Sequence, residues 1–134
     1  MKLLLDTHIL LWTLLGDDRL SKPARDAIAD EGNDVYYSIV SPWEVEIKRM
    51  AHPDEMDLTA EELVKYARES GFYQVPIRAA HVYELKNLRR REGAAPHKDP
   101  FDRIMICQAI AENMVFVTHD NLIRDYEIKN ILMS

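Results

Sequence analysis

Short runs of apolar residues alternate along this chain with segments that have helical spacing. The runs are Lys2–Leu5, Val35–Val40 and Val115–Val117, and a shorter one lies at Phe72–Val75. Continuous apolar runs of this length are typical of strands that are covered on both faces of a sheet. Because strands that alternate with helices pair in parallel, the pattern predicts an α/β sandwich with a mainly parallel central sheet.

Two segments have the sequence of a capping box, in which an N-cap hydroxyl and an acidic side chain three residues later bond to each other's backbone N–H groups. One is Ser41 with Glu44, where Pro42 fits the first helical position, and the other is Thr59 with Glu62. Each box predicts the start of a helix. For Glu44, this capping role is the alternative to a role at a functional site.

The second half of the chain predicts two further helices and a last strand. The helices run from Ala79 to about Arg91 and from Phe101 to about Asn113. In the first, the spacing of Val82 and Leu85 predicts that both side chains face the core. The second is apolar around most of its circumference, so we expect it to be largely buried. The tail over Ile128–Met133 predicts a strand at the sheet edge.

Composition bounds the compartment and the number of domains. The 134 residues contain no repeat or flexible linker, which predicts a single domain over residues 1–134. A lone cysteine, Cys107, excludes an internal disulfide framework and fits a reducing compartment. The apolar start of the chain is interrupted by Asp6 and His8 and is too short to span a bilayer. We therefore expect a cytoplasmic protein without a membrane segment.

The charge distribution limits how a nucleic acid could bind. With 23 acidic and 17 basic residues the net charge is −6, which argues against binding through overall positive charge. Basic residues are concentrated in residues 86–103, where six of them face three acidic ones. Phosphate contacts can be concentrated in this window, although Arg89–Arg91 equally fits a solvated helix end.

Five acidic residues are predicted to meet at one edge of the sheet. The carboxyl ends of parallel strands and the first turns of their connecting helices share an edge, where ligands of open α/β folds bind. Residues at such positions are Asp6, Glu44, Asp99, Asp102 and Asp120. Clustered carboxylates repel one another unless a cation neutralises them, and their hard oxygen atoms favour Mg²⁺ or Mn²⁺. The pattern therefore predicts a divalent metal site.

Most of these acids also have a purely structural explanation. Asp99 before Pro100 has the sequence of an N-cap, Asp102 complements a helix dipole, and Asp120 can cap a short helix after it. Asp6 is the exception, because a carboxylate at the end of a buried strand is costly unless it is paired.

Four blocks of sequence carry a resemblance to a known family. In chain order they are Leu3–His8, Ser41–Lys48, His97–Arg103 and Val117–Asp120. Together they resemble the PIN-domain ribonucleases, and more closely the VapC-type toxins of bacterial and archaeal toxin–antitoxin pairs. The blocks extend over essentially the whole chain. The resemblance implies a PIN-like three-layer α/β/α sandwich.

The resemblance also implies a set of site residues. The acidic quartet that binds divalent metal in this family corresponds to Asp6, Glu44, Asp102 and Asp120, with Asp99 as an accessory acid. All four quartet positions are acidic here. Residues beside the quartet are expected to contact water, phosphate or the RNA substrate, and these are Thr7, Thr118, Lys98 and Arg103.

The implied activity is endoribonuclease cleavage with Mg²⁺, or Mn²⁺ as a substitute, by a homodimeric toxin that a cognate antitoxin restrains. The quoted blocks hold no serine or cysteine nucleophile beside a base, so we expect attack by a metal-activated water. Two other interpretations stay open. One is a phosphatase of the haloacid dehalogenase type, which wants a second aspartate where His8 stands. The other is a catalytically silent PIN-like module that binds RNA or protein.

Overall fold

The computed structural model describes residues 1–134 and has a five-stranded sheet in which every neighbouring pair of strands is parallel. The strand order is β3-β2-β1-β4-β5, so β1 lies at the centre. In the register, Leu4 of β1 lies opposite Tyr36 of β2 on one side and Phe116 of β4 on the other. The strands are β1 (Lys2–Leu5), β2 (Asp34–Ser38), β3 (Tyr73–Val75), β4 (Val115–Thr118) and β5 (Ile131–Met133).

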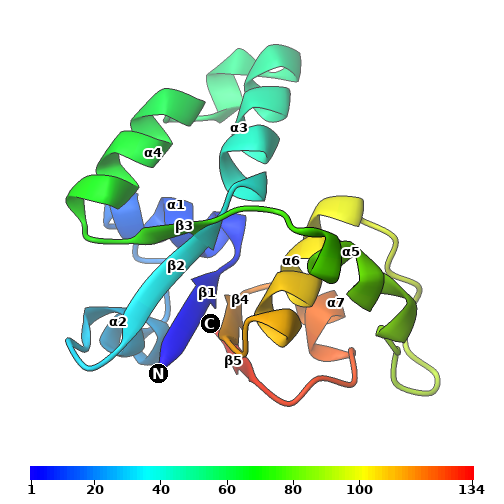
Figure 1. Ribbon diagram of the computed structural model, residues 1–134. Coiled ribbons are helices and arrows are strands. Elements are labelled where there is room, and N and C mark those ends of the chain that lie inside the picture. Colours follow the sequence, from blue (N-terminus) through cyan, green and yellow to red (C-terminus); the bar gives the residue numbers. More distant parts are fainter.

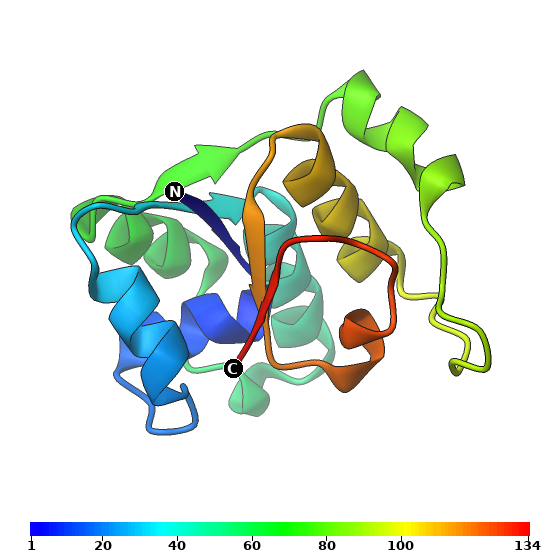
Figure 2. The same ribbon diagram turned by 90° about the horizontal axis from the view of Figure 1, so that it is seen from below.

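Helices cover both faces of this sheet (Figures 1 and 2). The helices are α1 (Thr7–Leu15), α2 (Lys22–Ala29), α3 (Val40–Ala51), α4 (Ala60–Glu69), α5 (Ala79–Glu84), α6 (Pro100–Ala111) and α7 (Asn121–Arg124), with 3-10 turns η1 (Pro53–Glu55) and η2 (Leu85–Asn87). In Figure 2, α1, α2 and α4 lie on one side of the sheet, and α5, α6 and α7 lie on the other. The predicted three-layer sandwich around a parallel sheet is confirmed.

Two hydrophobic cores fill the spaces between the sheet and its helices. Side chains of successive strand residues point to opposite faces. Leu3 and Leu5 enter the core that α1, α2 and α4 cover, whereas Leu4 enters the core that α6 covers. All three are fully buried. Because β1 is covered on both faces, its sequence is continuously apolar rather than alternating.

The two predicted capping boxes have different outcomes. Thr59 and Glu62 bond to each other's backbone N–H groups, at 3.0 Å in both directions, and start α4. The capping box predicted at Ser41 and Glu44 is wrong, because α3 begins before Ser41 and its N-cap residue makes no side-chain hydrogen bond. The side chains of Ser41 and Glu44 bond to Thr7 instead. A tertiary contact therefore takes the groups that a local cap would have used.

The helix predicted to start at Ala79 is shorter than expected. It ends at Glu84, followed by one 3-10 turn. Val82, predicted to face inward, is 47% exposed, whereas His81 is fully buried. His81 accepts a hydrogen bond from the Arg78 backbone and contacts Glu112 of the segment after α6 at 2.8 Å. A buried polar side chain thus occupies the face that the apolar spacing had assigned to Val82.

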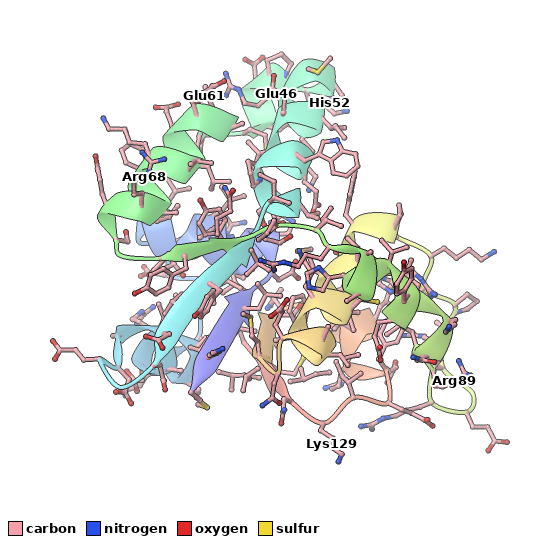
Figure 3. All side chains as sticks on the ribbon, viewed as in Figure 1. Glu46, His52, Glu61, Arg68, Arg89 and Lys129 are labelled. Carbon is pink, nitrogen blue, oxygen red and sulfur yellow. The ribbon has the colours of Figure 1, made fainter.

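Glu46 on α3 and Glu61 and Arg68 on α4 lie at the surface, as Figure 3 shows. The predicted last strand is confirmed over Ile131–Met133, where it pairs with β4 at the sheet edge. None of the helices is both long enough and apolar enough to cross a membrane.

Candidate metal centre

The carboxyl ends of β1 and β4 lie side by side at the centre of the sheet, where the strand order changes direction. From β1 the chain adds β2 and β3 on one side and then returns to add β4 and β5 on the other. Ligands of open α/β folds bind outside the carboxyl ends of the strands at such a switch point. Asp6 directly follows β1, and Asp120 lies two residues beyond β4. The topology therefore brings these two acids to one place.

A cavity of about 420 Å³ opens at this edge. All five predicted acids line it, together with basic and aromatic side chains from α1, α3 and the loops. The lining residues are Asp6, Thr7, His8, Trp12, Arg19, Glu44, Lys48, Asp99, Asp102, His119 and Asp120. Acids that are up to 114 positions apart in the sequence, from Asp6 to Asp120, thus share one polar cavity.

Asp6 is buried and held by two donors. The Thr118 hydroxyl donates to Oδ2 at 2.7 Å, and the Thr7 backbone N–H donates to Oδ1 at 2.8 Å. Burial raises the pKa of Asp6, and the two hydrogen bonds act in the opposite direction. The Thr118 hydroxyl also accepts from the Asp120 backbone N–H at 3.1 Å. Thr118 therefore joins two acids of the quartet across the switch point.

Glu44 is held by the side chain of Thr7, whose hydroxyl donates to Oε1 at 2.8 Å. The same hydroxyl lies 2.9 Å from the Ser41 hydroxyl. Since Thr7 has only one hydroxyl hydrogen, Ser41 is the donor in that second contact. Burial raises the pKa of Glu44 to about 7, and the Asp6 carboxylate adds to the increase. Both threonine hydroxyls thus orient carboxylates in this structure.

The surroundings of Asp102 also oppose its negative charge. It lies in the first turn of α6, and burial raises its pKa to about 8. This value includes the effect of the nearby carboxylates of Asp6, Asp99 and Glu44, which act in the same direction as burial. Groups with such pKa values bind a proton at neutral pH when no cation is present, and a divalent cation would replace that proton.

Asp99 and Asp120 are N-caps, as their structural explanation predicted, and they also line the cavity. Asp99 accepts from the backbone N–H groups of Phe101 and Asp102 at 2.9 and 3.2 Å, which starts α6. Asp120 accepts from the Leu122 backbone N–H at 2.9 Å, which starts α7. A carboxylate has two oxygen atoms, so one can cap a helix while the other faces the cavity.

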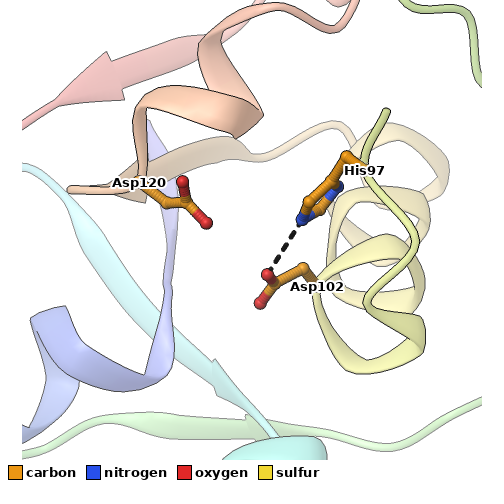
Figure 4. A group of neighbouring side chains, drawn as sticks. All are labelled: His97, Asp102 and Asp120. Atoms are coloured by element: carbon orange, nitrogen blue, oxygen red, sulfur yellow. Dashed lines mark hydrogen bonds and ion pairs between the residues drawn. The ribbon is translucent and has the colours of Figure 1, made fainter. Parts of the chain in front are cut away.

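His97 is a site residue that the sequence reasoning missed. Its Nε2 lies 3.1 Å from Asp102 Oδ2, and Figure 4 shows the Asp120 carboxylate facing this pair. One ligand atom from each of these three residues lies within 4.8 Å of the other two. Burial lowers the pKa of His97, which favours the neutral ring. His97 opens the block His97–Arg103 that carries the family resemblance, but nothing in the sequence distinguishes it from the other four histidines.

The cations at the cavity also differ from the expected ones. Lys98 is exposed and Arg103 donates to the His97 carbonyl at 3.4 Å, and neither residue lines the cavity. The basic residues that do line it are Arg19, after α1, and Lys48, on α3. Arg19 is paired with Asp17 at 2.7 Å. No sequence pattern around Arg19 or Lys48 marked them, because only the fold brings them to this edge.

Solved structures share this fold. One is VapBC2 from Rickettsia felis, bound to a DNA fragment from the VapBC2 promoter. It has a TM-score of 0.65 and 14% identity, and the match covers 99% of this chain and 98% of that chain. VapBC-1 from nontypeable Haemophilus influenzae has a TM-score of 0.61 and 16% identity over the same shares. No curated protein sequence matches this chain.

The sequence itself matches one family model, that of the PIN domain, over residues 3–129. This range holds β2, β3, β4, all of β1 except Lys2, and all five acids of the cavity. Because the match extends over nearly the whole chain, the protein belongs to the PIN domain family.

Proposed function

We propose that the protein is a metal-dependent endoribonuclease that hydrolyses RNA phosphodiester bonds with Mg²⁺, or with Mn²⁺ in its place. The observation that carries this proposal is the convergence of five carboxylates on one polar cavity at the switch point of the sheet. The quartet acids would hold the ion, with Asp99 beside them, and these residues are Asp6, Glu44, Asp102 and Asp120. Their hard oxygen atoms fit Mg²⁺ and Mn²⁺ better than softer metals.

A divalent cation held there supplies positive charge against the phosphate and activates the attacking water. The protein's own residues hold the site in shape. Thr118 and Thr7 orient the carboxylates of Asp6 and Glu44 through their hydroxyls. Lys48, on the cavity wall, would attract the RNA backbone locally although the whole chain is acidic.

Cleavage of RNA by the purified protein tests this proposal. Structured and single-stranded RNA are incubated with Mg²⁺ or Mn²⁺ and, in parallel, with a chelator. We expect cleavage only with metal, and a loss of about 100-fold or more for Asp6→Asn and Asp102→Asn, since each removes an anionic ligand. The matched control is Asp54→Asn, an exposed aspartate on η1, which should cleave like the wild type.

Two outcomes contradict the enzyme proposal in different ways. Cleavage that persists with chelator, or in both site variants, would show that the carboxylate cluster does not carry the activity. Binding of Mn²⁺ and RNA without cleavage of any RNA would favour the silent PIN-like module instead.

We infer further that the protein is the toxin of a toxin–antitoxin pair and acts as a homodimer in the cytoplasm. The resemblance of its sequence blocks to VapC-type toxins supports this, as does the likeness of its fold to two VapBC structures. Trp43, Ile47 and Met50 form an exposed apolar stripe along α3, as expected of a surface that a partner covers.

Growth and mass measurements test this assignment. Expression of the wild type should arrest bacterial growth, and Asp6→Asn should not. Light scattering at micromolar concentration should give the mass of two chains. Normal growth with wild-type protein at the same level would contradict the toxin assignment, and a monomer would contradict the dimer.

A further inference from the structure

A row of buried side chains connects Asp102 to the rest of the fold. His97 contacts Asp102 through Nε2, and its other ring nitrogen, Nδ1, lies 2.6 Å from the Tyr126 hydroxyl. Tyr126 is fully buried, and its ring meets the His97 ring edge-on at 5.4 Å between centroids. The proposed reaction makes no direct use of Tyr126, so its buried hydroxyl needs another explanation.

The directions of these hydrogen bonds follow from what each group can donate. Arg103 can only donate, so the Tyr126 hydroxyl accepts from it at 3.4 Å, and its single hydrogen can go to His97 Nδ1 at 2.6 Å or to the His97 carbonyl at 3.5 Å. A neutral imidazole has one N–H group. An ionised Asp102 carboxylate can only accept, so that N–H is at Nε2 and donates to Asp102, and Nδ1 accepts from the Tyr126 hydroxyl, which is nearer to it than to the His97 carbonyl. The row therefore runs in one direction, from a guanidinium to a carboxylate.

Arg90 holds this row in place. Its guanidinium lies over the Tyr126 ring, 4.6 Å from the centroid. It donates from Nε to the Ala95 carbonyl at 3.1 Å, in the loop before His97, and from Nη1 to the Leu122 carbonyl in α7. Since Asp120 caps α7, Arg90 joins the loop that carries His97 to the helix next to Asp120. Arg90 is thus engaged inside the fold rather than available to RNA.

The Asp102 carboxylate, like that of Glu44, is oriented by a single hydrogen-bond partner. Two donors orient the Asp6 carboxylate, whereas the only hydrogen bond to the Asp102 carboxylate comes from His97. Groups that hold a metal-binding side chain in its rotamer affect metal affinity about 10- to 100-fold.

We propose that His97 is a positioning residue of the metal site, and that Tyr126 and Arg90 hold its ring so that Nε2–H orients the Asp102 carboxylate toward the ion. The proposal rests on the proposed function, because it assumes that Asp102 binds metal. It differs from direct coordination by His97, since Nε2 cannot donate its hydrogen to Asp102 and bind the ion at the same time.

Two amide variants at His97 separate these roles. In His97→Gln the amide reaches about as far as Nε2 and can still donate to Asp102, whereas in His97→Asn it reaches only about as far as Nδ1. Titration calorimetry with Mn²⁺ should give an affinity within about threefold of the wild type for His97→Gln and about 10- to 100-fold weaker for His97→Asn. Tyr126→Phe should weaken binding by a smaller factor. Tyr83→Phe, which changes a tyrosine that is 67% exposed, should match the wild type.

A second readout needs no metal. Nitrogen-15 NMR of the wild type at about pH 9, above the pKa of Asp102, should show the His97 proton on Nε2, and Tyr126→Phe should mix the two tautomers because Nδ1 loses its donor. A proton on Nδ1 in the wild type would overturn the assignment. Circular dichroism of each variant establishes that it is folded.

The calorimetry distinguishes failure of this role from failure of the proposed function. If both amide variants bind Mn²⁺ equally weakly, His97 is a ligand, and if both bind like the wild type, it has no positioning role. Either result overturns the inference and leaves the metal site intact. If the wild type binds no Mn²⁺, the proposed function and the positioning role are both overturned.

Discussion

Single hydroxyl groups decide how the carboxylates lie in this cavity. Thr118 donates to Asp6 and accepts from the Asp120 backbone, so one side chain connects acids that follow two neighbouring strands. Thr7 connects Asp6 and Glu44 in the same way, through its N–H and its hydroxyl. Three of the four quartet acids, Asp6, Glu44 and Asp120, are therefore coupled through threonines.

Replacing Thr118 tests this coupling. Thr118→Val keeps the shape of the side chain but leaves a buried carboxylate oxygen and a backbone N–H without their partner. We expect a loss of about 1–3 kcal/mol in the free energy of unfolding, because an unsatisfied buried group keeps its desolvation cost. Thr118→Ser, which retains the hydroxyl, should lose less than half as much. Urea unfolding of metal-free protein measures both, and equal losses would show that packing, not the hydroxyl, is what matters.

Residue by residue, the sequence predicted the acids but not their surroundings. Asp6 and Asp120 could be predicted because they follow apolar strands, and strand ends in a parallel sheet share an edge. Arg19, Lys48 and His97 could not, since their place at the cavity depends on how loops and helices pack. A polar residue without periodicity has no sequence signal for such a contact.

Among the helices, α4 has the start that is most clearly encoded in the sequence. Thr59→Ala removes the N-cap oxygen that accepts from the Glu62 backbone. The expected loss is about 1 kcal/mol in the free energy of unfolding, as for other N-cap substitutions. Thr59→Ser should be close to the wild type. The same urea experiment measures the change, and an unchanged midpoint for Thr59→Ala would show that tertiary packing alone sets this helix start.

The central strand should be far more sensitive. Leu4 is fully buried in the core that α6 covers. Leu4→Ala should cost about 2–5 kcal/mol, because it removes buried methyl groups and leaves a cavity. The exposed Leu15, at the end of α1, offers a matched control, and Leu15→Ala should cost less than about 1 kcal/mol. Chemical denaturation compares them, and similar losses would contradict the assignment of β1 as the centre of the core.

Elements followed the sequence where local signals met no competition from tertiary contacts. The capping box at Thr59 formed because nothing else bonds to its two side chains. The one at Ser41 did not form, because the cavity uses Ser41 and Glu44 to hold Thr7. Contacts at the cavity thus replace the local capping interaction that the sequence of Ser41 and Glu44 favours.

At the scale of the whole molecule, the fold brings five carboxyl groups together at one edge of the sheet, where their negative charges repel one another. The raised pKa values of Glu44, about 7, and Asp102, about 8, show that metal-free protein binds protons there that the unfolded chain releases. A carboxyl group whose pKa is raised on folding contributes stability at low pH, and this contribution is lost as pH rises through the folded-state value. The acidic edge therefore makes metal-free protein less stable as the solution becomes more alkaline.

The useful window for measuring this is pH 6.5–8.5. The lowered pKa values of His8 and His97 change the stability only below about pH 6.5. The raised pKa of Cys107, about 11, changes it only at higher pH. Within the window, Tm of the metal-free protein should fall as pH rises, by roughly 3–5 °C per pH unit while one excess proton is bound. Asp102→Asn should flatten the curve, and Asp54→Asn should leave it unchanged.

Addition of Mn²⁺ should reverse this dependence. The ion competes with protons for the same carboxylates, so its affinity, and with it the increase in Tm at a fixed concentration, should grow from pH 6.5 to 8.5. The difference between curves with and without Mn²⁺, recorded by scanning calorimetry, should be largest at pH 8.5 for the wild type and much smaller for Asp102→Asn. An Mn²⁺ effect that is independent of pH would place the ion away from the protonated acids, and so away from this cavity.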